Sequence, residues 1–256
     1  MIQFNLNRFG KVARWSFIND KRYFVKSFLQ AFVVLLVMFV LFTMVFPKDV
    51  AREGDYNMCA IAVFILFVVT TLFGPSFMFY SMEGKHDMQA LLMLPASNFE
   101  KYLMRYASWI LLQPLYLAAF LAADLLQYVA HLVMGYGDGR FVAAALAETW
   151  SILVEHQWMP KAVHVLIPIA VWLHSLYALG ATFFRSRRFN WVLTSISLML
   201  LSTLQVWLLP SVPYREATTS HFILNDVFCT FWIVLNFWLS YRLFCRRQVI
   251  GKFVNL

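Results

Sequence analysis

The stretch EGKHDMQALLMLPASNFEKYLMRY, residues 83–106, decides the fold because it is a short charge-bearing segment between two long apolar runs. Of all residues in the chain, 61% are hydrophobic, 18% are aromatic and only 13% are charged. A water-soluble domain carries about 25% charged residues, so this composition excludes that class. The apolar runs on either side of the stretch are therefore expected to cross a lipid bilayer.

Six apolar runs are long enough to cross a bilayer, since a spanning helix needs about 20 mostly apolar residues. They cover residues 27–46, 58–80, 103–134, 162–184, 191–209 and 223–244. The sequence thus predicts an all-α, polytopic membrane protein with six transmembrane helices in a single domain, residues 1–256. The third run is too long for one straight crossing, so its helix is expected to continue out of the membrane.

The distribution of the 21 Lys and Arg residues predicts the orientation, because such residues are retained in cytoplasmic loops near the ends of spans. Most lie before the first span, in the second-to-third and fourth-to-fifth connections, and in the tail. The exceptions are Lys48, Arg52, Arg140, Lys161 and Arg215. Both termini are therefore predicted to be cytoplasmic, in a cell inner (plasma) membrane. The net charge of +8 then indicates topology and contact with anionic lipid headgroups, and no soluble basic domain is present to bind nucleic acid.

Residues 1–26 precede the first span and are predicted to form an amphipathic helix. Steps of about 100° per residue gather apolar side chains on one side, namely Ile2, Leu6, Phe9, Ala13, Phe17 and Phe24. The opposite side carries Arg8, Lys11, Arg14, Lys21 and Arg22. This pattern is typical of a helix lying in the inner membrane interface, and a cytoplasmic helix packed on a partner protein is the alternative. The segment lacks the A-x-A-like cleavage site of a secretory signal peptide, so no removal is expected.

Within the opening stretch, residues 87–94 are predicted to form a short helix whose apolar face contains Met88, Leu91 and Leu92. Pro95 ends this helix, and Ser97 or Asn98 can cap the next one. An apolar helix face outside the bilayer needs a cover. That cover is either a partner protein or the ends of the protein's own spans.

This stretch resembles the corresponding connection in the permease subunits of type-2 ABC (ATP-binding cassette) exporters. The resemblance consists of an acidic residue and Gly, a short helix with paired leucines, a Leu-Pro-small-Ser turn and a basic residue entering the third span. The matching positions are Glu83, Gly84, Leu91, Leu92, Leu94, Pro95, Ala96 and Ser97, with Met88 in the same helix. In that family this connection, here residues 83–102, carries the coupling helix, which sits in a cleft of the ATPase subunit. The leader at residues 9–24 is similar to the family's elbow helix.

The resemblance implies a permease subunit that forms the membrane pathway of an ATP-driven exporter together with a second, identical or different, permease subunit. The sequence contains no G-x-x-x-x-G-K-[ST] loop to hold nucleotide phosphates. ATP and Mg²⁺ are therefore expected on a separate ABC ATPase, and no cofactor or metal on this chain. Its histidines are dispersed and lack the spacing of a motif such as H-E-x-x-H, so no catalytic residue is predicted.

A proton-coupled secondary transporter is the main alternative, because Asp124 and His174 lie inside predicted spans, where ionisable side chains are costly and often functional. The competing interpretation places Asp124 near a helix end and gives His174 one interhelical hydrogen bond. Further polar residues that could line a pathway, or only join helices, are Gln113, Gln127, Gln205 and Asn236. A membrane scaffold without a transported substrate is the third alternative. Cys59 and Cys229 could meet in an oxidising compartment if they pair at all.

Overall fold

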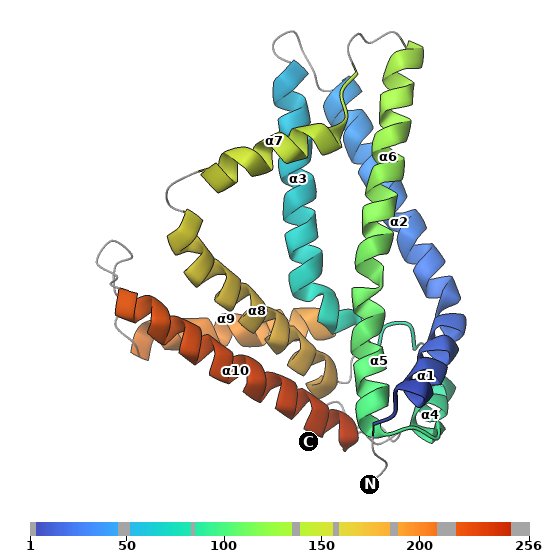
Figure 1. Ribbon diagram of the computed structural model, residues 1–256, viewed down its shortest axis with the longest axis vertical. Coiled ribbons are helices and arrows are strands. Elements are labelled where there is room, and N and C mark those ends of the chain that lie inside the picture. The colour runs from blue at the N-terminus through green and yellow to red at the C-terminus, as the bar shows by residue number, and fades with distance from the viewer. Residues whose placement is uncertain are drawn as a thin grey trace. The chain divides into compact units, whose positions relative to one another are not determined.

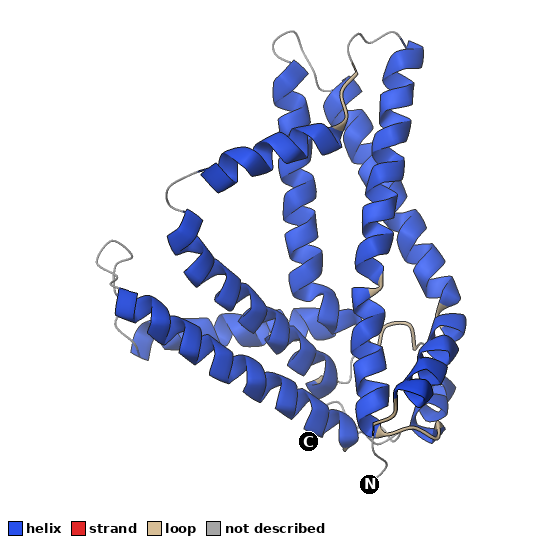
Figure 2. Cartoon of the chain, in the orientation of Figure 1, coloured by secondary structure: helices blue, strands red, loops and turns tan. Residues whose placement is uncertain are grey.

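The computed structural model describes residues 4–45, 52–82, 85–134, 139–155, 159–184, 189–208 and 219–246, and within these ranges it contains helices and no strand (Figures 1 and 2). The first helices are α1 Leu6–Asn19, α2 Lys21–Val40, the π-helical turn η1 Leu41–Val45, α3 Arg52–Phe73 and the 3₁₀ turn η2 Gly74–Phe77. They are followed by α4 Lys85–Met93, α5 Asn98–Ile110, α6 Leu112–Met134, α7 Val142–Glu155, α8 Met159–Phe183, α9 Asn190–Leu208 and α10 Thr219–Cys245. The all-α prediction is confirmed for this part of the chain.

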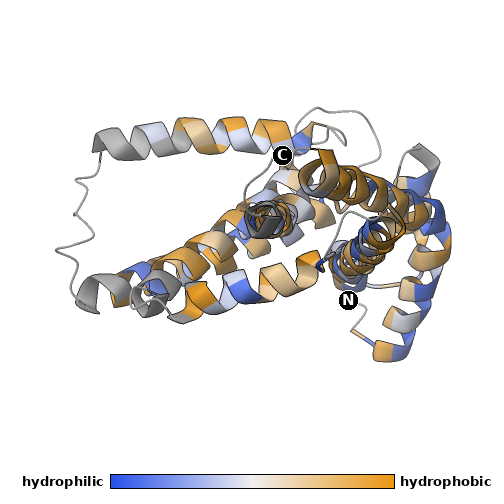
Figure 3. Cartoon of the chain, turned by 90° about the horizontal axis from the view of Figure 1, so that it is seen from above, coloured by the Kyte–Doolittle hydropathy of each residue, from blue (hydrophilic) through white to orange (hydrophobic). Residues whose placement is uncertain are grey.

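Five stretches of the described residues are long and apolar enough to cross a membrane: Lys21–Val45, Tyr56–Phe77, Asn98–Met134, His164–Phe183 and Ile223–Cys245. Hydrophobic residues predominate along these helices (Figure 3), as expected where lipid replaces water as the solvent. They are the helices of a multi-pass membrane protein. The predicted fifth span coincides with the 19-residue helix α9, of which Asn190–Leu200 forms a shorter apolar stretch. The count of six spans therefore stays a prediction.

The stretch at Asn98–Met134 has 37 residues, many more than the about 20 that a crossing requires. A helix of this length must tilt strongly or extend beyond the hydrocarbon core. Its first two turns carry Glu100, Lys101 and Arg105, and charged side chains are strongly disfavoured in hydrocarbon. These charges favour a position of the start of α5 outside the hydrocarbon core, and the start of the third span near Leu103 stays a prediction.

The leader forms a helix that is shorter than predicted. α1 ends at Asn19, and the backbone of Asp20 (φ −90°, ψ 5°) departs from helical values before α2 begins at Lys21. Phe24 is thus a buried residue of α2, and the prediction of one helix running to Phe24 is wrong. Asp favours helix ends over helix interiors, which explains the break. The interfacial position of α1 stays a prediction.

The chain divides into two compact units. The first unit draws its described residues from 1–18, 71–109 and 160–256, and the second unit from 19–70 and 110–159. Each unit thus combines segments that are distant in sequence. The prediction of one membrane domain over residues 1–256 stays a prediction.

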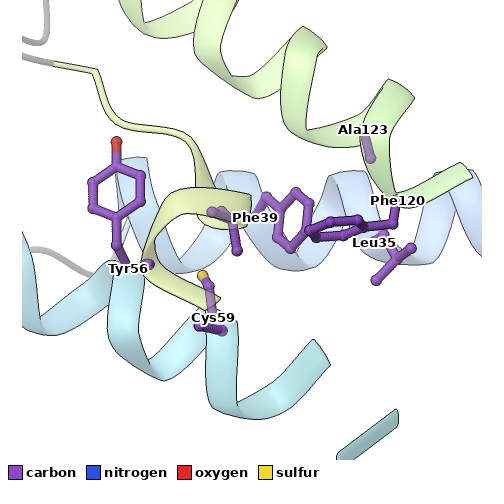
Figure 4. Packing of buried hydrophobic residues seen from close by; sticks show 9 residues of the cluster. Leu35, Phe39, Tyr56, Cys59, Phe120 and Ala123 are labelled. Atoms are coloured by element: carbon purple, nitrogen blue, oxygen red, sulfur yellow. The ribbon is translucent and has the colours of Figure 1, made fainter. Parts of the chain in front are cut away.

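The second unit has an apolar core to which α2, α3, α6 and α7 contribute (Figure 4). The rings of Phe39 and Phe120 meet edge to face, with centroids 6.0 Å apart. Small residues fill the remaining contacts and let the helix backbones approach closely: Cys59, Ala60, Ala123 and Ala145. Neither Cys59 nor Cys229, which belongs to the first unit, forms a disulfide in the described part of the chain.

The first unit has its core at the start of the third span. The core residues are Met78, Phe79, Met82, Met88, Leu91, Tyr102, Ala181 and Phe244, which come from the segment after η2 and from α4, α5, α8 and α10. The Tyr102 hydroxyl donates to Ser240 Oγ (3.0 Å), and the Ser240 hydroxyl donates to the Ala178 carbonyl (3.0 Å). These bonds fasten α8 and α10 to the start of α5.

Candidate functional site

The predicted short helix of the 83–102 segment is present as α4. Its Met88 and Leu91 side chains are 5% and 0% exposed, because they pack into the core of the first unit. Ala96, in the turn after α4, is also buried and packs with Val12 of α1 and Met104 of α5. The cover of this apolar face is therefore the protein itself, which decides between the two alternatives left open by the sequence. The matching residues Glu83 and Gly84 lie outside the described residues.

The opposite side of α4 and the following turn are exposed in this chain. Met93 is 83% exposed, and Gln89, Ala90 and Pro95 are exposed beside it, whereas Leu92 and Leu94 are half-buried. Single exposed apolar side chains are common on protein surfaces, so the exposure of Met93 marks an accessible surface and does not by itself identify a partner. We define the docking surface as Gln89, Ala90, Met93 and Pro95.

Glu100, in the first turn of α5, holds the docking turn to the leader helix. Its carboxylate is fully buried and accepts four hydrogen bonds. Oε1 accepts from Asn5 N–H (2.8 Å) and Arg8 Nη2 (2.7 Å), and Oε2 accepts from Arg8 Nε (2.8 Å) and Ser97 N–H (2.8 Å). Ser97 Oγ in turn accepts from Glu100 N–H (3.2 Å), which completes a capping box. The Arg8 guanidinium, helped by the two backbone N–H groups, lowers the pKa of Glu100 to about 2 against the opposing effect of burial.

Lys101, the next residue, holds the other side of the turn. Its ammonium donates to the Leu92 carbonyl at the end of α4 (2.7 Å). The C-terminal carbonyls of a helix have no partner within the helix and favour a positive charge. Burial lowers the pKa of Lys101, and the neighbouring Glu100 carboxylate opposes this shift. Two consecutive residues of α5 therefore fix both sides of the turn that carries Pro95.

Arg105, one turn further along α5, extends this attachment. The side chain is 1% exposed and donates to three oxygens: the Met78 carbonyl (3.1 Å), Ser16 Oγ (3.1 Å) and Ser81 Oγ (2.5 Å). It therefore joins α5 to the leader and to the segment that precedes α4. The docking surface belongs to a body with several attachments and is not an isolated loop.

The leader residues divide between this network and the surface. Val12 and Ser16 are buried, and Arg8 and Phe9 are half-buried. Lys11, Arg14 and Phe17 are exposed. Arg8 was predicted to lie on the basic side of the leader helix, and its guanidinium forms the ion pair with Glu100. Its position on α1 is therefore explained by packing within the protein.

Asp124 lies in α6 of the second unit, with 2% of its surface exposed. Oδ1 accepts from Val142 N–H (2.8 Å) and Oδ2 from Ala143 N–H (3.0 Å), the first two residues of α7. These N–H groups are donors that the helix itself cannot satisfy, and the positive end of the helix favours an anion. The arrangement supports a structural role for Asp124.

His174 lies in α8 of the first unit between two partners. Its Nδ1 is 2.8 Å from the Thr71 carbonyl and its Nε2 is 2.6 Å from the Tyr106 hydroxyl. Because a carbonyl can only accept, Nδ1 carries the hydrogen and a neutral ring accepts from Tyr106 at Nε2. The Trp109 ring packs against it with centroids 4.9 Å apart. This doubly bonded imidazole joins α3, α5 and α8.

The other proposed pathway residues have individual partners or lie outside the description. Asn236 is 2% exposed and donates to Ser175 Oγ (2.9 Å), which joins α10 to α8. Gln127 is fully buried and donates to the Tyr56 hydroxyl (3.3 Å). Gln113 has buried amide atoms without a hydrogen-bond partner among the described residues. The side chain of Gln205 lies outside the described part of the structure.

The network around Glu100, Lys101 and Arg105 was not predicted from the sequence. A signal for one part was present, because Ser97 followed by Glu100 has the spacing of a capping box. Nothing local indicated that Arg8, 92 residues earlier, completes the site.

Comparison of the chain with protein-family models, curated proteins and solved structures finds no match.

Proposed function

We propose that this chain is the permease subunit of an ATP-driven exporter of the type-2 ABC class, placed in a cell inner membrane with both termini cytoplasmic. The observation that supports this most is the construction of residues 85–101. A helix too short to span a membrane carries an exposed Met93, while neighbouring charged residues attach it firmly to the start of the third span. A segment that receives force from a partner needs both properties.

In this proposal, nucleotide-driven closure of two ATPase subunits favours one arrangement of the spans over another. The docking surface transmits that preference, because α4 cannot move far without α5 while Glu100 and Lys101 hold the turn between them. ATP and Mg²⁺ bind to the partner ATPase. A second permease subunit, identical or different, completes the pathway, and membrane lipids surround both.

The residues proposed to touch the ATPase differ from those that the sequence favoured. Met88 and Leu91 shape the helix from its buried side, and Met93 and Pro95 offer the contact. This division sets the design of the test. A change at Met93 alters the surface alone, whereas a change at Leu91 disturbs the core as well.

Co-purification tests the proposal. The tagged chain, extracted from its native membrane in mild detergent, is expected to retain an ATPase that contains a P-loop. Met93→Glu places a charge on the docking surface and is expected to lower the amount of retained ATPase at least about tenfold, since burying an unpaired charge is costly. Met93→Leu keeps the apolar contact and serves as the matched control. A complex that transports its substrate without any ATPase contradicts the proposal.

The proton-coupled alternative gains no support from the partners of Asp124 and His174. Asp124 binds the start of α7, and His174 bonds to Thr71 and Tyr106. Both side chains are used within their own unit. We therefore do not propose a proton relay.

A further inference from the structure

One carboxylate caps the start of α7 within the second unit. Asp124 is 18 residues before Val142 in sequence, so it acts as a helix cap supplied by another helix. Val142 and Ala145 are fully buried beneath α7 in the core of this unit. Further along α7, Trp150, Ile152 and Val154 are more than half exposed. The buried start of α7 is therefore the part that holds it in place.

Both oxygens of Asp124 accept a backbone N–H, an arrangement that requires the ionised form. A proton on either oxygen would turn an acceptor into an O–H donor that faces another donor, and one of the two bonds would be lost. Asp124 forms no ion pair among the described residues. The helix N-terminus is thus its main source of favourable electrostatic interaction.

The titratable and charged groups around this site have other partners. On α6, His131 Nε2 is 3.0 Å from Thr43 Oγ1 of η1. From α3, the Tyr56 hydroxyl accepts from Gln127 and from the Arg140 N–H. The Arg140 guanidinium pairs with Glu148 of α7. The contribution of α2 to the core here is apolar: Leu35 and Phe39.

We propose that Asp124 is a pH-sensitive latch for α7. The ionised carboxylate holds the first turn of α7 against α6, and protonation from the surrounding solution releases that turn. The inference does not depend on the proposed transport function, since it concerns only the contact between α6 and α7.

Hydrogen exchange of the intact protein in lipid nanodiscs tests the latch, because the Val142 and Ala143 amides are themselves the bonded groups. Exchange rates are divided by the intrinsic rates of an unstructured peptide at each pH. Acidification from about pH 7 to about pH 2.5, well below the ordinary aspartic-acid pKa of about 3.9, is expected to reduce the protection of these two amides about tenfold or more, the size expected for loss of a hydrogen bond to a charged group. Amides of residues 149–152, in the second half of α7, should change much less.

Asp124→Asn provides the matched variant, since it keeps the size of the side chain but does not titrate. Its first-turn amides are expected to be weakly protected at every pH. If this variant fails to accumulate, Asp124→Ser replaces it, with the same expectation. Protection that does not depend on pH in the unaltered protein overturns the proposal. A pH dependence that persists in the variant also overturns it and assigns the effect to another group, such as His131.

Discussion

Glu100 joins two helices that are 92 residues apart in sequence. A buried carboxylate is costly unless its lone pairs are satisfied, and here a guanidinium and two backbone N–H groups satisfy them. The same carboxylate begins α5 through the capping box with Ser97. One side chain therefore sets both a local helix start and a long-range contact.

This pairing predicts a pH-dependent stability. The pKa of Glu100 falls from 4.5 to about 2 mainly because of Arg8, so its stabilising contribution is complete above about pH 4.5 and is lost as the pH falls toward 2. Glu100→Gln removes the titrating group. Thermal unfolding of the detergent-solubilised proteins should show a lower midpoint for the variant at neutral pH, by the equivalent of roughly 1.5–3 kcal/mol.

The difference between the two midpoints is the quantity to follow, because all other carboxyl groups titrate in both proteins. It should be constant above about pH 5 and shrink between about pH 4.5 and about pH 2. A difference that stays constant over the acidic range would show that Arg8 does not stabilise the charged form of Glu100.

For single residues, the sequence predicted roles that depend on neighbouring positions better than roles that depend on distant partners. Ser97 was correctly identified as a candidate cap, because capping depends on neighbouring residues. The roles of Arg8 and Asp124 depend on partners brought close only by the fold, and no spacing rule encodes them. Met88 and Leu91 were correctly placed on one helix face, but periodicity alone does not tell whether the protein or a partner covers that face.

Among the elements, the junction of α3 and η2 depends on the absence of a side chain at Gly74. A Cβ at this position would overlap the indole of Trp109. Trp109 is itself 8% exposed and packs against Tyr106 and His174, so it has little room to move. The turn can approach α5 this closely only with glycine.

Gly74→Ala is therefore expected to destabilise the protein by about 1–3 kcal/mol, the usual cost of overpacking a filled site. Gly10→Ala is the matched control, since a Cβ at Gly10 in α1 meets nothing within 4 Å. Alanine in that helix should be neutral or stabilising by up to about 1 kcal/mol. The midpoint of thermal unfolding checks both, and equal midpoints for the two variants would contradict the packing argument.

The sequence predicted the helices that can be identified from the length of an apolar run alone. Five stretches of the predicted spans recur as candidate crossings, and α4 appears where Pro95 predicted a helix end. The break at Asp20 was missed because the apolar spacing of the leader continues past it to Phe24. The periodicity of apolar residues indicates which side of a helix is apolar. It does not indicate where one helix ends and the next begins.

For the whole molecule, the membrane topology depends on whether α9 crosses the membrane. With α9 crossing the membrane, six spans place both ends of the described chain on the same side; without it, five spans place them on opposite sides. The Lys and Arg distribution favours the first arrangement. We predict that α9 crosses.

Reporter fusions show on which side of the membrane each end of the chain and each end of α9 lies. Reporters placed before α1 and after Cys245 should both be active on the cytoplasmic side and inaccessible to impermeant reagents in intact cells. Reporters placed before and after α9 should lie on opposite sides of the membrane and control for misinsertion. End reporters on opposite sides would contradict the six-span arrangement.

The bonds from Asn5 and Arg8 to Glu100 also constrain the order of events during synthesis. The leader leaves the ribosome first, but its carboxylate partner is made only after two apolar stretches have been translated. Before Glu100 has been synthesised, Asn5 and Arg8 at the start of the leader cannot form their bonds to this carboxylate. Synthesis of the start of α5, which carries Glu100, therefore sets the earliest moment at which the leader can form these bonds.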